Sequence, residues 1–117
     1  MQDRKIITIR KLVFISILLA ILVVTLGAYT RLTHAGLGCP DWPGCYGHLD
    51  VPNTEEQIAK AELAFPERPV EAHKAWNEMI HRYFAGTLGL FILFIAIMSF
   101  RARHVGSPVF LPLLILL

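Results

Sequence analysis

The amino-acid sequence predicts an all-α membrane protein, a transmembrane helix bundle, from three observations. The chain of 117 residues is 55% hydrophobic, which is more apolar than an ordinary soluble domain of this size. Residues 12–30 form a run of 19 without a charged side chain, and residues 83–100 form a second run of 18. A helix needs roughly 20 apolar residues to cross the hydrocarbon core of a bilayer. We therefore predict one full transmembrane helix over each run.

The first run follows Arg10 and Lys11, as the apolar part of a signal peptide would. It is long for that role, and no cleavage site of the Ala-x-Ala type follows Thr30. A second span also makes a membrane helix the simpler interpretation. A third apolar run, residues 109–117, covers only about half a span. We therefore expect this chain to be the N-terminal portion of a longer protein, with two full spans and the start of a third.

The charged residues predict which side of the membrane each segment faces. Residues 1–11 carry a net charge of +3, and Arg101 and Arg103 add +2 after the second span, whereas residues 31–82 carry −3. Flanking segments rich in Lys and Arg stay in the cytoplasm. We expect residues 1–11 and the loop 101–108 to be cytoplasmic and the loop 31–82 to lie outside. The overall charge of +2 reflects this topology and gives no signal for nucleic acid.

The outer loop contains both cysteines of the chain, Cys39 and Cys45. The sequence Pro-Asp-Trp-Pro-Gly between them favours turns, and disulfides persist in an outside location. We predict a disulfide, which could stabilise the loop by about 2–3 kcal/mol or, as a reducible bond, take part in redox chemistry. Together with His34 and His48 the two cysteines also match the ligand types of a zinc site. Their irregular spacing and outside location favour oxidation instead.

Two further helical segments are expected within this loop. A capping sequence at residues 53–57 predicts an amphipathic helix of about ten residues that ends before Pro66. A second helix can begin near Val70, because Pro69 suits a first helical turn. It would run through Glu78 directly into the second span.

The start of the second span carries the most informative polar residues. Glu78 and His81 are three residues apart and share a helix face. An ionisable residue so close to a span is a functional-site hypothesis, although an interfacial histidine can also be a packed or snorkelling side chain. Ala85 and Gly89 continue the stripe of His81, with Gly86 beside it. These small residues either leave a slot for a flat macrocycle ligated by His81 or serve close helix packing.

Arg31 and Arg82 flank the same outer edge of the membrane. They could bind the carboxylates of a cofactor or anchor the two helices at the lipid headgroups. Glu78 beside a metal-ligating histidine could orient that ligand, relay protons or act as a general acid or base.

Two stretches, GAYTRLTHAGLGCPDWPGCYG and KAWNEMIHRYFAGTLGL, together resemble the N-terminal part of the haem A synthase family. The family pattern has Thr-Arg-Leu-Thr, two glycines, Cys-Pro-Asp-Trp-Pro, a second cysteine, and Glu-x-x-His-Arg at the start of the second helix. In this chain the pattern falls on residues 30–33, Gly36 and Gly38, residues 39–43, Cys45, and residues 78–82.

The resemblance implies an eight-helix protein of the bacterial inner membrane, built from two four-helix halves. One half holds haem b and the other binds the substrate, haem O. The reaction oxidises the C8 methyl group of haem O to a formyl group, giving the haem A of terminal oxidases, with molecular oxygen as co-substrate. The resemblance implies that His81 is an axial ligand of the haem iron, that Glu78 is the catalytic or proton-relaying carboxylate, and that Cys39 and Cys45 form the outer-loop pair.

The expected partners are the lipid bilayer, a haem O synthase upstream, and a second copy of the chain. The family's second ligand for this half lies on a fourth helix, which these 117 residues do not reach, so we expect the chain alone to be inactive. Two other functions stay open. One is a membrane thiol–disulfide or quinone-linked redox protein that uses Cys39 and Cys45. The other is a non-catalytic haem carrier or oxidase assembly protein.

Overall fold

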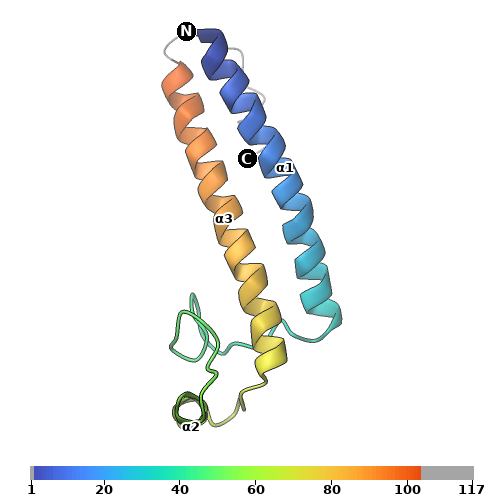
Figure 1. The fold of residues 1–117 in the computed structure, drawn as a ribbon, viewed down its shortest axis with the longest axis vertical. Helices are drawn as coiled ribbons and strands as arrows, with labels where there is room; N and C mark the ends of the chain where they lie inside the picture. The colour runs from blue at the N-terminus through green and yellow to red at the C-terminus, as the bar shows by residue number, and fades with distance from the viewer. Residues whose placement is uncertain (1, 104–117) are drawn as a thin grey trace. The chain divides into compact units, whose positions relative to one another are not determined.

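The computed structural model describes residues 2–103, and the predicted start of a third span at 109–117 lies outside this part. The described residues form three helices, α1 (Gln2–Leu32), α2 (Glu55–Ala64) and α3 (Ala72–Arg103), as Figure 1 shows. No strand longer than an isolated bridge, between Cys45 and His48, occurs within residues 2–103. The predicted all-α class is therefore confirmed.

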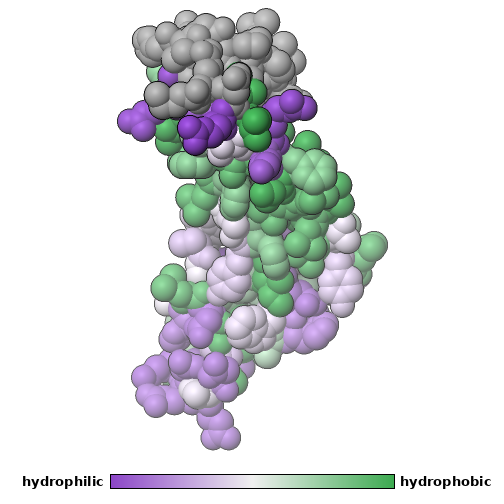
Figure 2. Space-filling model, turned by 45° about the horizontal axis from the view of Figure 1, so that its top comes forward, coloured by the Kyte–Doolittle hydropathy of each residue, from purple (hydrophilic) through white to green (hydrophobic). Residues whose placement is uncertain are grey.

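The helices α1 and α3 have the length and composition of membrane spans. The candidate spans are Arg4–Leu32 and Ala72–Arg101. Within the most apolar 18-residue stretch of each, only 6% and 11% is buried. A core helix of a soluble protein buries most of its apolar side chains, whereas Phe14 and Val24 here are 63% and 70% exposed. On the face drawn in Figure 2, apolar surface covers the middle of the long helices, and polar surface gathers over the loop that carries α2 and near the opposite helix ends.

Both long helices extend beyond the uncharged runs that predicted them. Residues 2–11 include five charged side chains but contain no glycine or proline, so nothing interrupts the helix before the uncharged run begins. Similarly, α3 begins at Ala72, close to the predicted start near Val70, and continues unbroken through the second span. As a result, the polar residues at the start of this span lie on a regular helix.

The short helix α2 follows its predicted capping sequence. Thr54 is the N-cap: its side chain accepts a hydrogen bond from Gln57 N, and the Gln57 side chain accepts one from the Thr54 backbone. This reciprocal pair satisfies two backbone donors that a helix start otherwise leaves free. The helix ends at Ala64, before Pro66, as predicted.

The chain divides into two compact units. One comprises residues 2–22 and 85–103 within the described part, where Ile9, Ser16, Ile95 and Ser99 are buried. The other is Val23–Phe84, which contains the end of α1, the whole outer loop and the first turns of α3. The residues of chemical interest lie in this second unit, which we call the loop unit.

The core of the loop unit forms around the two cysteines. Cys39 and Cys45 pack with Val51, with Ala61 of α2, and with buried residues of α3. The ring of Tyr46 meets that of Phe65 edge to face, with centroids 5.8 Å apart. This cluster attaches the loop and α2 to the first turns of α3. Its remaining members are Tyr46, Ala75 and Met79, with Phe65 and Val70 packed against it.

Candidate functional site

A disulfide joins Cys39 to Cys45 in the outer loop, with Cα atoms 4.9 Å apart. Both residues are buried, at 6% and 0% exposed. Because both sulfurs belong to this bond, neither can serve as a thiolate ligand of zinc. No group of three or more His, Cys, Asp or Glu side chains suited to a metal ion occurs in the described part of the chain.

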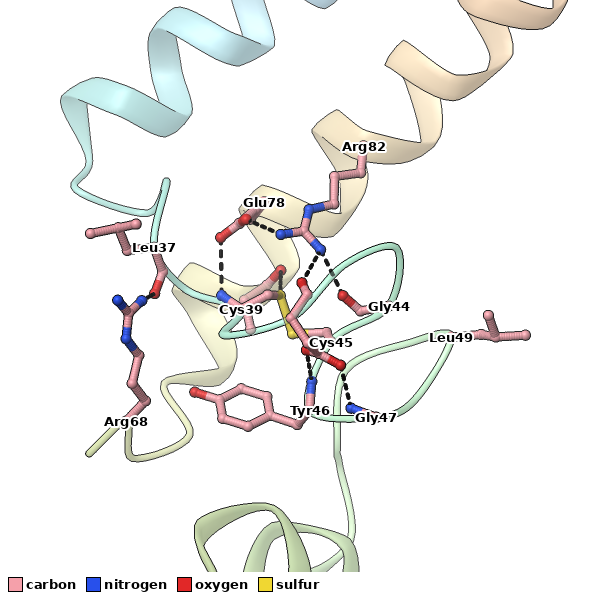
Figure 3. Close-up of a disulfide and its surroundings, with 12 residues drawn as sticks. Leu37, Cys39, Gly44, Cys45, Tyr46, Gly47, Leu49, Arg68, Glu78 and Arg82 are labelled. Carbon is pink, nitrogen blue, oxygen red and sulfur yellow. Dashed lines mark hydrogen bonds and ion pairs between the residues drawn. A yellow bond between two sulfur atoms is a disulfide. The ribbon is translucent and has the colours of Figure 1, made fainter. Parts of the chain in front are cut away.

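Glu78 and Arg82 connect this disulfide loop to α3 (Figure 3). The Cys39 backbone N–H donates to Glu78 Oε2 at 3.0 Å, and Arg82 Nη2 binds the other carboxylate oxygen, Oε1. Arg82 Nη1 also donates to the carbonyls of Asp41 at 2.8 Å and Gly44 at 2.6 Å, which lie inside the disulfide-closed ring. The side chains of Arg82 and Glu78 are only 17% and 10% exposed. Each charge is therefore paired and hydrogen-bonded, as a mostly buried charge must be.

A turn within the loop depends on the side chain of Asp41. Its two oxygens accept hydrogen bonds from Tyr46 N at 2.6 Å and Gly47 N at 2.7 Å. Tyr46 and Gly47 both have positive φ, at 53° and 79°. The carboxylate thus supports a left-handed backbone that a tyrosine rarely adopts.

The Tyr46 side chain closes the other end of the loop. Its hydroxyl donates to the Pro69 carbonyl at 3.1 Å, and the residue is 5% exposed. Burial raises the pKa of this phenol above its ordinary value, and the nearby positive charge of Arg68 offsets part of that effect.

A cavity of about 500 Å³ lies on the α1 side of Glu78 and Arg82. Its volume is within the range of small-molecule sites, about 300–1,000 Å³. It brings together four residues that the sequence analysis proposed: Arg31, Glu78, His81 and Arg82. Cys39 and Cys45 do not line it, but the Cys39 N–H holds the Glu78 carboxylate beside it. The other lining residues are Gly27, Thr30, His34, Gly36 and Leu37.

The sequence analysis gave no site role to Gly27, Thr30 and Leu37, and it considered His34 only as a possible zinc ligand. A glycine inside a helical pattern is itself a signal of close packing, and Gly27 carried that signal. Thr30 and His34 lay within the quoted motif, but no rule of spacing showed which of its side chains would face α3.

His81 presents its imidazole to this cavity. The Nδ1 atom is buried and has no hydrogen-bond partner within residues 2–103. Buried polar atoms are nearly always partnered, so an exception suggests a functional group. Of the small residues that continue its stripe, none lines the cavity. A Cβ on Gly86 or Gly89 would meet no atom of the described chain within 4 Å, so neither glycine makes room for another described part of the chain.

The residues of the cavity fit a haem group. Histidine is the common axial ligand of haem iron, and Nδ1 of His81 has no competing hydrogen-bond partner in the described residues. Arg31 adds a cation to the cavity wall, and Glu78 adds a carboxylate whose charge is held by Arg82. The arrangement can bind a metal macrocycle on one histidine and place a fixed carboxylate beside it.

Comparisons with known proteins agree with this description. The sequence model of the COX15-CtaA family, described as cytochrome oxidase assembly protein, matches residues 10–117. The chain is 49% identical over 104 residues to a haem A synthase of Shewanella oneidensis, covering 87% of this chain and 32% of that protein. It is 28% identical over 96 residues to a haem A synthase of Exiguobacterium sibiricum, covering 82% of this chain and 25% of that protein. No solved structure matches.

A third relative, a haem A synthase of Bartonella henselae, is 28% identical over 110 residues, covering 85% of this chain and 31% of that protein. The chain therefore spans between a quarter and a third of the length of these relatives.

Proposed function

The chain belongs to the COX15-CtaA family of cytochrome oxidase assembly proteins, and from this premise we propose that it is the N-terminal, haem-ligating part of a haem A synthase. The complete protein would oxidise the C8 methyl group of haem O to a formyl group. The observation that carries the proposal is the imidazole of His81 in a cavity whose wall also contains Glu78 and Arg31. A possible iron ligand, His81, and a carboxylate held in place, Glu78, thus line the same cavity.

In this proposal each residue has a distinct task. His81 would ligate the iron through a ring nitrogen, and Arg31 would bind a carboxylate of the macrocycle. Glu78 would hold or pass a proton, because Arg82 and the Cys39 N–H keep its carboxylate in one position. The bound haem would supply the oxidation chemistry, with molecular oxygen as co-substrate and haem b in the other half of the complete protein.

Arg82 would act differently from the cofactor-binding role expected from the sequence. Its Nη1 atom is committed to the carbonyls of Asp41 and Gly44, and Nη2 to Glu78. We therefore infer that Arg82 positions Glu78 and the disulfide loop, while Arg31 is the cation available to the cofactor.

The proposal includes a location and partners. The protein would span the inner membrane of a bacterium, with its N-terminus in the cytoplasm and the disulfide loop outside, in agreement with the charge distribution of the chain. Haem O would arrive from a haem O synthase, and a second copy of the chain could complete a homo-oligomer.

Haem binding by the full chain in detergent tests the proposal. Titration with ferric iron protoporphyrin IX should give a histidine-ligated absorbance spectrum. His81→Ala should weaken binding about tenfold or more, because the iron loses its protein ligand. His73→Ala is the control, since His73 is exposed and outside the cavity. Equal binding by the wild type and His81→Ala would refute the assignment.

A second experiment separates an enzyme from a haem carrier. In cells that depend on the gene for haem A, Glu78→Gln should leave haem binding intact and abolish conversion of haem O, as measured by chromatography of extracted haems. If the protein were a haem carrier, cells with Glu78→Gln would not accumulate haem O. The thiol–disulfide alternative is weakened by the burial of both cysteines, because thiol exchange needs access to a sulfur atom.

A further inference from the structure

The helix α1 approaches His81 so closely at Gly27 that a side chain there would displace the imidazole. A Cβ atom built on Gly27 would lie 2.9 Å from His81 Cε1 and 3.4 Å from Nε2. Non-bonded carbon atoms prefer separations of about 3.5–4.0 Å. The imidazole therefore lies against the bare backbone of α1.

The backbone freedom of glycine does not explain why residue 27 is a glycine. Gly27 lies inside α1, and a glycine within a helix is less stable than an alanine at the same position. A Cβ on Gly36, which also lines the cavity, would meet no atom of the described chain within 4 Å. Of the two glycines that line the cavity, only the one that faces the imidazole therefore requires the missing side chain.

A second contact holds the two helices in this register. Thr30 Oγ1 donates to the Leu26 carbonyl at 2.8 Å and reaches the Asn77 carbonyl of α3 at 3.5 Å. Thr30 is about one turn from Gly27, and Asn77 is about one turn from His81. The contacts 27–81 and 30–77 thus lie about one helical turn apart between antiparallel helix segments, and the second contact keeps Gly27 opposite the imidazole.

We propose that Gly27 is a positioning residue for the haem ligand, and that its lack of a side chain sets where the His81 imidazole lies. This inference rests on the proposed function. No hydrogen bond from the described part of the chain holds His81 Nδ1, so packing contributes to fixing the ring, and the Gly27 backbone is one wall of that packing. The proposal rests on the contact between the ring of the ligand His81 and the backbone of Gly27 in the wall of the cavity.

An alanine at position 27 should affect folding and ligation in opposite directions. The added methyl group meets the end of a side chain that can rotate, so the helices can remain paired while the ring moves. Alanine also favours the helix. We therefore expect Gly27→Ala to keep or raise the thermal stability of the full chain in detergent and to weaken its binding of ferric iron protoporphyrin IX about tenfold or more. The absorbance spectrum of the bound haem should also shift.

Two matched variants make the test specific. Ala28→Gly changes the neighbouring exposed residue and adds no atom near His81, so haem binding should match the wild type. The double variant Gly27→Ala/Ala28→Gly restores the number of glycines in the helix but keeps the methyl group, so it should bind as weakly as Gly27→Ala. Far-ultraviolet circular dichroism confirms that each variant is helical. A Gly27→Ala chain that is not helical would overturn the inference, because the inference requires the helices to stay paired while the ring moves.

The outcomes separate this inference from the proposed function. Suppose that the wild type binds haem and that both variants carrying Gly27→Ala bind it with the same affinity and spectrum. This result would overturn the role of Gly27 and leave the proposed function intact. Failure of the wild type itself to bind would overturn the proposed function and this inference with it. In the haem-free chain, the ¹⁵N imidazole resonance of His81 should move in Gly27→Ala and stay in Ala28→Gly. An unmoved resonance in Gly27→Ala would also overturn the inference.

Discussion

The guanidinium of Arg82 shows how one side chain can join a covalent loop to a helix. It binds two carbonyls inside the disulfide ring and the carboxylate of Glu78, which in turn accepts the Cys39 N–H. The sequence placed Arg82 correctly at the start of the second span, and the motif that contains it was recognisable. Its partners could not be predicted, because they are backbone carbonyls about forty residues earlier in the chain.

Replacing Arg82 should loosen the disulfide loop. Arg82→Gln removes the charge that balances the mostly buried Glu78 and the donors to Asp41 and Gly44, at a cost of about 2 kcal/mol. We expect dithiothreitol to reduce the Cys39–Cys45 bond about tenfold faster or more, as measured by thiol alkylation and mass spectrometry. The exposed pair of Lys60 and Glu56 provides the control, and Lys60→Gln should leave the rate unchanged. Equal rates for both variants would contradict this role of Arg82.

Tyr46 should give the loop a dependence on alkaline pH. Its pKa is raised in the folded chain by burial, so the folded state holds the phenol proton more tightly than the unfolded state does. This contribution is complete below about pH 10, the ordinary value, and is lost as the pH rises through the folded-state pKa.

Tyr46→Phe should remove this dependence and lower stability at neutral pH by about 1 kcal/mol, because the hydrogen bond to the Pro69 carbonyl is lost. Thermal unfolding at about pH 8 and about pH 11, followed by near-ultraviolet circular dichroism, measures both effects. Tyr29 is 50% exposed, and Tyr29→Phe is the control. A wild-type loop as stable at the higher pH as at the lower would contradict the expectation.

At the scale of elements, the outer loop is attached to α3 by close backbone contact. A Cβ on Gly38 would lie 2.6 Å from the Lys74 carbonyl carbon and 2.7 Å from Ala75 N. These atoms belong to the first turn of α3 and cannot move without opening the helix. The absence of a side chain at Gly38 therefore lets the loop reach the turn before Glu78.

Gly38→Ala should lift the loop from α3. Overpacking of this kind costs about 1–3 kcal/mol. We expect the Cys39 amide, which binds Glu78, to exchange with deuterium faster in the variant. Gly36→Ala, two residues earlier, adds a methyl group where no described atom lies within 4 Å, and its exchange should match the wild type. Unchanged protection of Cys39 in Gly38→Ala would show that the loop does not depend on this contact.

Elements that depend on a pattern of neighbouring residues were predictable from the sequence. The capping pair of Thr54 and Gln57 fixed the start of α2, and the uncharged runs located α1 and α3. The ends of the long helices were less predictable, since polar residues continue a helix whenever no glycine or proline stops it. The contact of Gly27 with His81 depends on how two helices pair, which no local pattern records.

At the scale of the whole molecule, the chain is a membrane protein with two apolar helices and a polar loop between them. Its orientation is predicted by charge alone, and its lysines offer a direct test. Lys5 and Lys11 lie in the segment expected to be cytoplasmic, while Lys60 on α2 is 71% exposed in the loop expected outside.

A membrane-impermeant amine reagent should label Lys60 in intact spheroplasts. Lys5 and Lys11 should react only after lysis, because the predicted topology places them in the cytoplasm. Peptide mass spectrometry identifies the labelled sites. Reaction of Lys5 before lysis, with Lys60 protected, would reverse the topology.

Glu78, His81 and Arg82 lie on one unbroken helix, so the angles between them are set by the helical repeat of about 3.6 residues per turn. One residue inserted within 83–100 would turn the rest of α3 by about 100° and leave all three unchanged. The same insertion between Glu78 and His81 would rotate the carboxylate, and the loop attached to it, away from the imidazole. The geometry shared by the carboxylate and the imidazole is therefore set by the interval Glu-x-x-His-Arg itself, and it would change if that interval gained or lost a residue.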